Sequence, residues 1–238
     1  MYNIIIPTYN EVENITILLK MIIKEMEILG KPFKIIVIDD NSPDGTLKKV
    51  IQMNNPNIVH LERSGKLGLG TAYKFAVDHC KFPFTVIMDA DLSHDPIYIK
   101  KMIEIQEDKD ADIVSGTRYY GGGVHGWSFL RRLTSRCANN IAKLMLNLDS
   151  SDLTGSYRLY KTSVLSLLLE KSISKGYAIQ MELICRAEAE NLKIYEQPIV
   201  FYERDKGKSK ISPYEFMNFM VVVMNIVFGL YKCFLVVV

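Results

Sequence analysis

Short apolar segments alternate with segments of helical periodicity through the first half of this 238-residue chain. The segment from Phe33 to Ile38 is almost continuously apolar, which is typical of a strand buried on both faces. Between it and an earlier strand, Asn3 to Ile6, apolar residues recur at helical spacing from Ile15 to Leu29. Such strand–helix–strand units form right-handed crossovers and a largely parallel sheet. The sequence therefore predicts an α/β fold with a mostly parallel sheet flanked by helices.

Further strands and helices follow in the same alternating order. Asn10 is predicted to cap the first helix, with Glu13 three residues later in the reciprocal position. No repeat or low-complexity linker divides the chain. We predict strands at 58–61, 84–88, 113–115 and 194–201, a short helix from about residue 46, and helices at 71–80, 96–106, 128–146, 163–170 and 178–191.

Polar clusters follow four of the predicted strands at the point where each strand ends. PTYNE follows the first strand, DDNSPDGT the second, DADLSHD the fourth and GTRY the fifth. Ligands of open parallel sheets bind at the carboxyl ends of the strands, because the loops converge there. The sequence therefore predicts one site at this edge of the sheet.

Asp89 and Asp91 stand two positions apart in the cluster after the fourth strand. In extended backbone, side chains two residues apart point to the same side, so both carboxylates can reach one point. Two such charges repel unless a cation lies between them, and oxygen ligands suit Mg²⁺ or Mn²⁺. The alternative is a solvated turn in which the aspartates cap a helix.

Other familiar site patterns fit less well. The loop that starts at Asp40 begins like a calcium loop but has Ile51 where a bidentate glutamate is required. Gly65, Gly68 and Gly70 match neither a dinucleotide fingerprint nor a P-loop; they indicate either a flexible turn or a helix start that approaches a phosphate. The four histidines lack zinc spacing, and no Ser-His-Asp order supports hydrolase chemistry.

Composition and the end of the chain restrict the kind of partner. The net charge of +2 gives no bulk electrostatic signal for nucleic acid, and four widely spaced cysteines favour reduced thiols over zinc or disulfide frameworks. From Phe216 to Val238 the chain is apolar except for Asn218, Asn225 and Lys232. As a helix this segment would extend roughly 34 Å, about the hydrocarbon thickness of a bilayer. We expect a transmembrane helix; a buried helix or one packed on a partner subunit is the alternative.

Basic residues border the predicted acidic site. Arg118 ends the fifth strand, and Arg131 and Arg132 begin the helix 128–146. A basic loop precedes the apolar tail, with Arg204, Lys206, Lys208 and Lys210. Arginine forks suit phosphate oxygens. Any one of these residues could simply be a solvated surface cation. Several of them together, beside an acidic metal site, favour a substrate with several phosphates.

Five motifs occur in one order between Asn3 and about Lys210: IIIPTYNE, DDNSPDGT, MDADLSHDP, SGTRY and RDKGKSK. Together they resemble the family 2 glycosyltransferases of the GT-A fold and, within that family, the dolichol-phosphate mannose synthases. The resemblance implies a GT-A Rossmann-like domain over residues 1–211 and a hydrophobic membrane-anchor segment over residues 212–238.

The resemblance also implies roles for individual residues. It makes Asp89, Asp91 and Arg118 catalytic and places a metal at Asp89, Asp91 and Ser93, although the family often has glutamine where Ser93 stands. The acceptor phosphate is expected at Arg118, Arg131 and Ser135. The donor is expected to contact a larger set: Pro7, Tyr9, Glu11, Ile38, Asp40, Asp89, Ala90, Asp91, Arg118, Arg204 and Lys210.

The activity implied by the resemblance is an inverting transfer of mannose from GDP-mannose to dolichyl phosphate, for protein glycosylation and GPI-anchor synthesis. A lipid monophosphate has a second pKa of about 6, so it is largely ionised at neutral pH and can act as the nucleophile without a protein base. The implied location is the endoplasmic reticulum membrane, with the catalytic domain facing the cytosol. The implied partners are both substrates, Mg²⁺ or Mn²⁺, a lipid bilayer and, as an open question, small membrane subunits.

Two alternatives to this activity stay open. One is a polyprenyl-phosphate glucosyltransferase that uses UDP-glucose. The other is a non-catalytic, membrane-tethered subunit that binds nucleotide sugars. An assay with competing donors distinguishes the glucosyltransferase from a mannosyltransferase. Binding of the donor without transfer would indicate the non-catalytic subunit.

Overall fold

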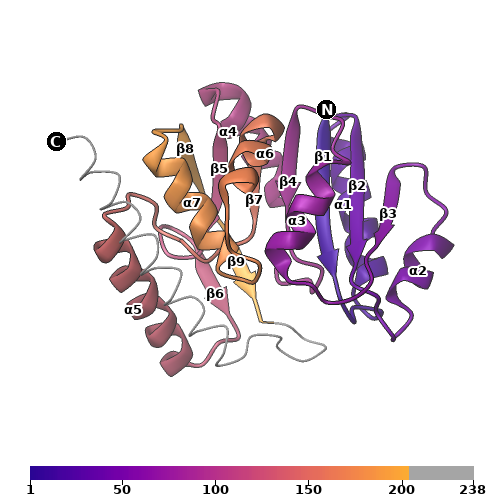
Figure 1. Ribbon diagram of the computed structural model, residues 1–238, viewed down its shortest axis with the longest axis horizontal. Coiled ribbons are helices and arrows are strands. Elements are labelled where there is room, and N and C mark those ends of the chain that lie inside the picture. The colour runs from indigo at the N-terminus through magenta and orange to yellow at the C-terminus, as the bar shows by residue number, and fades with distance from the viewer. Residues whose placement is uncertain (204–238) are drawn as a thin grey trace.

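A seven-stranded sheet forms the centre of the computed structural model, which describes residues 1–203 (Figure 1). All strands except β7 run in one direction, because β7 pairs antiparallel with both of its neighbours. The α/β fold and mostly parallel sheet expected from the sequence are confirmed. The strands in spatial order are β3 (Ile58–Glu62), β2 (Phe33–Asp39), β1 (Tyr2–Thr8), β4 (Phe84–Ile87), β7 (Arg158–Lys161), β5 (Ile113–Thr117) and β8 (Ile194–Pro198).

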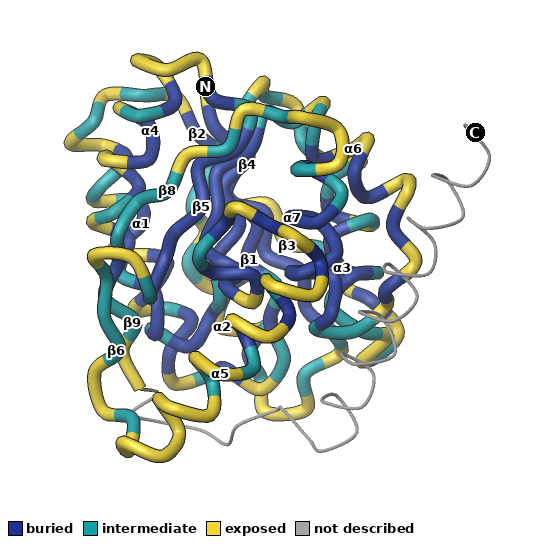
Figure 2. The backbone as a smooth tube through the Cα atoms, turned by 90° about the vertical axis from the view of Figure 1, so that its left-hand side faces the viewer, coloured by how far each residue is buried: buried dark blue, intermediate teal, exposed yellow. Residues whose placement is uncertain are grey.

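Helices cover both faces of the sheet, and Figure 2 shows the buried strands between them. Neighbouring residues of one strand enter separate cores; Ile4 packs on the first face and Ile5 on the second. This explains why the central strands are apolar at nearly every position. The helices on the first face are α1 (Ile15–Ile28), α2 (Thr46–Gln52) and α4 (Tyr98–Lys109). Those on the second are α3 (Leu69–Val77), α5 (Phe129–Leu146), α6 (Thr162–Lys171) and α7 (Ile179–Ala189).

A small second sheet pairs β6 (Gly123–His125) in parallel with β9 (Val200–Tyr202). The single strand predicted over 194–201 is therefore wrong, because β8 and β9 belong to different sheets. An antiparallel bridge joins Phe201 of β9 to His94, which follows the acidic pair. The second sheet thus brings β9 against the loop that follows β4.

Two local predictions differ from the structure. Asn10 does not cap the first helix: its backbone has a φ of +56°, and α1 starts after Asn14 instead. The antiparallel strand β7 was not expected, because Arg158 and Lys161 give its four residues no clear strand pattern.

The predicted C-terminal features lie outside the described residues. They comprise Arg204, Lys210 and the apolar segment 212–238, so the transmembrane helix and the domain boundary at residue 211 stay predictions. Within residues 1–203, no helix is both long and apolar enough to cross a membrane.

Candidate active site

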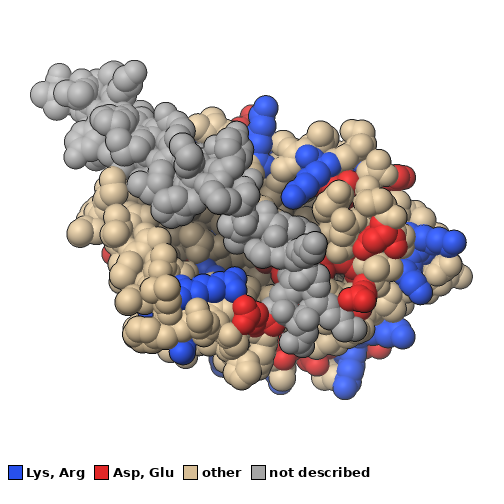
Figure 3. All heavy atoms as spheres, turned by 90° about the horizontal axis from the view of Figure 1, so that it is seen from below, with Lys and Arg blue, Asp and Glu red and all other residues tan. Residues whose placement is uncertain are grey.

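The loops that follow β1, β2, β4 and β5 lie at one edge of the sheet, because these strands are parallel. Pro7 pairs with Ile38 across β1 and β2, and the Asp40 amide donates to the Thr8 carbonyl at 3.1 Å. Figure 3 looks onto this edge, where both acidic and basic side chains reach the surface. The structure therefore brings together the first two donor-binding clusters expected from the sequence.

Asp40 forms a two-pronged ion pair with Arg63, which directly follows β3. The Arg63 Nε donates to Asp40 Oδ1 and Nη2 donates to Oδ2, each at 2.7 Å, while Nη1 donates to the Thr71 hydroxyl at 2.7 Å. Burial raises the pKa of the Asp40 carboxyl, against the opposing effect of the Arg63 hydrogen bonds. A ligand at this point would therefore meet the Asp40 carboxylate and the Arg63 guanidinium side by side. The sequence had suggested the carboxylate alone.

Tyr9 and Glu11 have different surroundings. The Lys66 ammonium lies 5.6 Å from the centre of the Tyr9 ring. Glu11 is buried; its carboxylate accepts from Asn14 Nδ2 at 2.8 Å, and its amide donates to the Thr46 hydroxyl at 2.9 Å. Glu11 thus links the loop after β1 to the starts of α1 and α2.

Asp89 and Asp91 follow β4 in a turn. The backbone bends here, and Leu92 has a φ of +64°, so the extended backbone assumed from the sequence is wrong. Asp89 Oδ2 accepts from the Ser156 hydroxyl at 2.8 Å, and Asp91 Oδ1 accepts from the Ser93 amide at 3.1 Å. The turn and these contacts, not the strand pleat, set the directions of the two carboxylates.

His94 lies next to the acidic pair, although its position in the sequence gave no sign of a role here. Its Nδ1 accepts a hydrogen bond from the Asp89 amide at 3.2 Å, and its ring packs on two aromatic rings. Burial lowers the His94 pKa; Asp89, Asp91 and Asp152 act to raise it and Arg118 acts to lower it. All four groups therefore lie within electrostatic reach of one buried ring.

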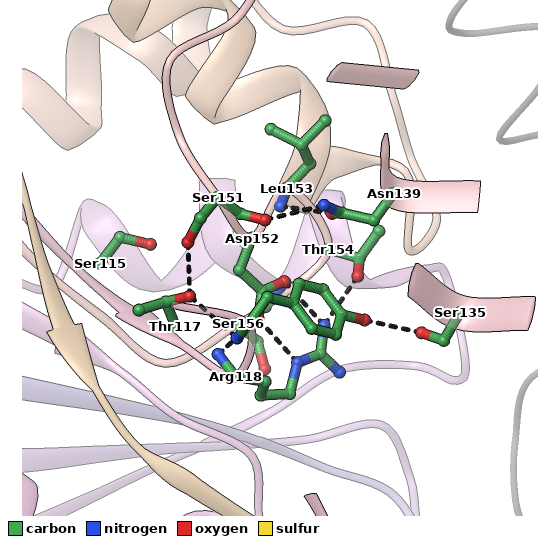
Figure 4. A network of polar contacts seen from close by, with 12 residues as sticks. Ser115, Thr117, Arg118, Ser135, Asn139, Ser151, Asp152, Leu153, Thr154 and Ser156 are labelled. Carbon is green, nitrogen blue, oxygen red and sulfur yellow. Dashed lines mark hydrogen bonds and ion pairs between the residues drawn. The ribbon is translucent and has the colours of Figure 1, made fainter. Parts of the chain in front are cut away.

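Arg118 follows β5 and pairs with Asp152 inside the protein (Figure 4). Its Nε and Nη2 donate to the two Asp152 oxygens at 2.7 and 2.8 Å, and Nη2 also donates to the Thr154 hydroxyl at 2.8 Å. Arg118 is 7% exposed and Asp152 is 0% exposed. Burial alone would lower the Arg118 pKa, but the Asp152 carboxylate outweighs this effect and the pKa is raised. The guanidinium therefore stays charged.

The loop from Asp152 to Ser156 joins the two halves of the site. At one end Asp152 holds Arg118, and at the other the Ser156 hydroxyl donates to Asp89. The Gly155 amide donates to Asp152 Oδ1 at 3.0 Å and closes the loop. The sequence indicated only a turn here, because the partners of the loop lie 34 and 67 positions away.

Ser135 and Arg131, the residues expected at the acceptor end, come from α5. The Ser135 hydroxyl lies 2.7 Å from the hydroxyl of Tyr119 (Figure 4). The Arg131 guanidinium carbon lies 4.2 Å from the centre of the Trp127 ring. The Arg118 guanidinium carbon lies 5.2 Å from the Tyr119 ring centre and 5.9 Å from that of Trp127. The structure thus joins the three expected residues through two aromatic side chains.

Gly68 and Gly70 allow close backbone packing at the start of α3. A Cβ at Gly68 would lie 2.4 Å from the Lys175 carbonyl oxygen, and a Cβ at Gly70 would lie 2.2 Å from the Ser174 carbonyl oxygen. The Gly70 amide donates to the Lys175 carbonyl at 2.8 Å. These contacts explain glycine at positions 68 and 70, whereas a Cβ at Gly65 would meet nothing within 4 Å.

The acidic pair fits a divalent metal that is shared with a substrate. Within residues 1–203, no group of three or more His, Cys, Asp or Glu side chains could hold an ion by itself. Mg²⁺ commonly takes only one or two carboxylates and completes its shell with waters and substrate phosphates. Asp89, whose side chain is 34% exposed, and Asp91 offer that donor set. Ser93 contacts Asp91 through its amide, and its role as a third ligand stays a prediction.

Residues 3–169 match the family model described as Glycosyl transferase family 2. The chain is a family 2 glycosyltransferase. This glycosyltransferase is 37% identical to the polyprenol monophosphomannose synthase of Mycolicibacterium smegmatis over 217 residues, which cover 88% of this chain and 80% of that protein. It is 34% identical to the undecaprenyl-phosphate mannosyltransferase of Micrococcus luteus over 219 residues, 87% of this chain and 86% of that protein.

Solved structures show the same fold. The glucosyl-3-phosphoglycerate synthase of Mycobacterium tuberculosis, in complex with Mn²⁺, UDP and phosphoglyceric acid, superposes with a TM-score of 0.68. The match covers 96% of this glycosyltransferase and 78% of that chain at 15% identity. The same enzyme is also known with Mg²⁺ and UDP. At this identity the likeness concerns the fold alone, and it confirms the GT-A-like arrangement.

Proposed function

We propose that this glycosyltransferase transfers mannose from GDP-mannose to a polyprenyl monophosphate, with inversion at the sugar carbon. The observation that carries the proposal is the loop from Asp152 to Ser156, which holds a buried, charged arginine at one end and an acidic residue of the Asp89–Asp91 pair at the other. Such a site suits two phosphorylated substrates that react with each other. The names of the two mannosyltransferase relatives support mannose as the sugar and a polyprenyl phosphate as the acceptor.

In the proposed reaction, an oxygen of the acceptor phosphate attacks the anomeric carbon of mannose. The bond from that carbon to the diphosphate oxygen breaks, and GDP leaves with the electron pair. Asp89 and Asp91, with Ser93 as the third candidate ligand, would hold a divalent metal, which would supply positive charge to stabilise GDP as the leaving group. The metal complexes of the structural neighbour support Mg²⁺ or Mn²⁺.

The chain's own residues orient the two substrates. Arg118 stays charged, so it can bind phosphate oxygens beside the acidic pair. Burial would raise the Asp152 pKa, but Arg118 outweighs burial and the pKa is lowered, so Asp152 stays ionised. Asp152 therefore holds Arg118 in place, and the acceptor phosphate needs no base because it is already ionised at neutral pH.

The nucleoside end of the donor is proposed to lie on β1 and β2. Pro7 and Ile38 pair across these strands, Tyr9 and Glu11 follow β1, and the Asp40–Arg63 pair provides both an acceptor and donors. Guanine presents donors and acceptors side by side and matches such a pair. Ala90, Arg204 and Lys210 complete the proposed donor set.

The decisive experiment incubates the full chain with labelled GDP-mannose, Mn²⁺ or Mg²⁺, and either undecaprenyl or dolichyl phosphate. Transfer of label to lipid is expected, and the preferred lipid identifies the acceptor. Asp91→Ala should abolish turnover, whereas Asp108→Ala, an exposed aspartate on α4, should not. No transfer to either lipid with either metal contradicts the proposal.

Two further arms test the alternatives. Labelled UDP-glucose, added in equal amount to GDP-mannose, tests the alternative of a glucosyltransferase. That alternative predicts labelled glucose on the lipid. Binding of GDP without transfer from any donor would favour a non-catalytic subunit. The intact Asp89, Asp91 and Arg118 favour catalysis.

The cellular location forms part of the proposal. The apolar segment 212–238 is proposed to anchor the enzyme with its catalytic domain in the cytosol, where nucleotide sugars are available. Preference for dolichyl phosphate would support the endoplasmic reticulum as the membrane, and preference for undecaprenyl phosphate would contradict it. Release of a chain ending at residue 211 from membranes would support the anchor.

A further inference from the structure

Tyr119 contacts two arginines at the acceptor end of the site. The centre of its ring is 5.2 Å from the guanidinium carbon of Arg118 and 5.9 Å from that of Arg136 on α5. Its hydroxyl lies 2.7 Å from that of Ser135, the residue before Arg136. One side chain therefore fixes the β5 loop to α5 through both its ring and its hydroxyl.

The arginines at this end differ in their ion pairs. Arg118 pairs with buried Asp152, and Arg131 donates to Glu203 at 2.8 Å, so each shares its charge with a carboxylate. Arg136 is exposed and forms no ion pair with any residue in the described range 1–203. A monophosphate ester carries a charge of about −1.5 to −2 at pH 7, so it needs positive charge that is not already neutralised.

We propose that Arg136, aligned by Tyr119, binds the phosphate of the acceptor together with Arg118. The inference rests on the proposed function, because it assigns a further residue to the acceptor subsite of that reaction. Tyr119 is a positioning residue: it contacts the two guanidinium groups and Ser135, and it need not contact the phosphate itself.

The geometry favours this role for chemical reasons. An arginine stacked on an aromatic ring keeps the N–H groups at its edge free to donate, and the ring reduces the number of orientations the side chain samples. The hydroxyl contact between Tyr119 and Ser135 keeps the first half of α5 next to Arg118. Two guanidinium groups on one ring can then donate to oxygens of one phosphate.

The test compares Arg136→Gln with Arg132→Gln, one turn earlier on the same helix. Arg132 is also exposed, belongs to neither of the two substrate sets named above, and forms no ion pair or cation–π contact within residues 1–203. Arg136→Gln should raise the KM for the polyprenyl phosphate at least about tenfold, the loss expected for a hydrogen bond to a charged group. Its KM for GDP-mannose, its melting temperature and the kinetics of Arg132→Gln should stay close to wild type. Equal kinetics for the two variants would overturn the proposal.

A pH series separates phosphate binding from a structural role. Because the second phosphate pKa is about 6, the acceptor loses one charge between pH 7.5 and 5.5. The ratio of the Arg136→Gln KM to the wild-type KM should therefore shrink as the pH falls. A constant ratio would indicate a change of structure and contradict the proposal.

Two substitutions of Tyr119 test whether it positions Arg136. Tyr119→Phe keeps the ring and removes the hydroxyl, whereas Tyr119→Leu removes both contacts. Tyr119→Leu should approach the acceptor KM of Arg136→Gln, and Tyr119→Phe should lie between it and wild type. If Tyr119→Leu leaves the acceptor KM unchanged, Tyr119 does not position Arg136.

A binding measurement distinguishes failure of this inference from failure of the proposed function. Calorimetric titration with farnesyl phosphate, a short isoprenyl monophosphate, requires no turnover. If wild type binds this probe but transfers no mannose, the proposed reaction fails, and weaker binding by Arg136→Gln still supports the phosphate site. If wild type transfers mannose and both arginine variants bind the probe equally well, only the role of Arg136 fails.

Discussion

Arg118 and Asp152 illustrate how single residues build this site. A buried charge is costly unless it is paired and hydrogen-bonded, and each member of this pair supplies the opposite charge that the other needs. Asp152 accepts from the Arg118 side chain and from its amide, so it fixes both the position and the charge of the guanidinium. The same contacts lower the Asp152 pKa although burial would raise it.

Asp152→Asn is expected to destabilise the fold and to reduce turnover. The asparagine leaves Arg118 charged and buried without a carboxylate, and breaking a buried pair in this way costs about 3–5 kcal/mol. Urea denaturation measures the loss of unfolding free energy, and the transfer assay measures turnover. Asp108→Asn, on exposed α4 surface, is the control and should change neither. A stable, active Asp152→Asn variant would show that Arg118 does not depend on this partner.

At the scale of elements, periodicity predicts those parts of the fold that bury apolar side chains regularly. Strands β1, β2 and β4 and helix α1 were predictable because their apolar residues follow one spacing throughout. Strand β7 was not, since its Arg158 is fully buried and donates to the carbonyls of Gln180 and Leu153, which the local sequence does not reveal.

The candidate site also contains residues that the sequence predicts and residues that it does not. Asp89, Asp91 and Arg118 were predictable because each directly follows a strand of the parallel sheet. Arg63 and Asp152 were not singled out, since their importance depends on partners 23 and 34 positions away. The directions of the carboxylates could not be predicted either, because a turn with Leu92 at positive φ replaces the extended strand.

The packing of α3 on the loop before α7 leads to a prediction about glycine. Gly70→Ala would place a Cβ 2.2 Å from the Ser174 carbonyl oxygen, so the backbone must move apart. Overpacking of this kind costs about 1–3 kcal/mol. A Cβ at Gly65, five residues earlier, meets nothing within 4 Å, so Gly65→Ala is the matched control. Thermal denaturation should show a lower melting temperature for Gly70→Ala alone.

The same loop depends on Glu182, which is fully buried on α7. Its carboxylate accepts from the Ile173 and Ser174 amides at 3.0 and 2.8 Å and from Arg186 at 2.7 Å. Burial would raise its pKa, but these hydrogen bonds outweigh burial and the pKa lies below its ordinary value of 4.5. The ionised carboxylate is therefore the form that stabilises the fold.

Glu182→Gln should reduce stability at neutral pH and remove part of its pH dependence. A carboxyl with a lowered pKa in the folded state stabilises the protein above its unfolded pKa, and this contribution is lost as the pH falls through the folded pKa. We expect a loss of about 2 kcal/mol at pH 7. The difference from wild type should shrink as the pH falls below 4.5. Urea denaturation at several pH values measures it, with the exposed Glu104→Gln as control. A difference that stays constant with pH would contradict the assignment.

At the scale of the whole molecule, the parallel sheet collects charges of opposite sign at one edge. The Asp89–Asp91 pair would repel a diphosphate, whereas the charged Arg118 would attract one. A bound metal reverses the sign at the acidic pair, so metal and donor should bind cooperatively. Cooperative binding is measurable without turnover, because a ligand that binds only the folded state raises the melting temperature.

We therefore expect Mn²⁺ and GDP together to stabilise the full chain in detergent far more than either alone. At 100 times the dissociation constant, a ligand adds about 2.7 kcal/mol, which corresponds to a rise of roughly 5–10 °C for a chain of this size. Asp91→Asn should abolish the joint effect because it removes one of the two carboxylates proposed to bind the metal, whereas Asp108→Asn should preserve it. If GDP alone raises the melting temperature as much as GDP with Mn²⁺, the acidic pair does not act through a metal. Arg118 would then remain to bind the diphosphate, and EDTA would leave transfer unchanged.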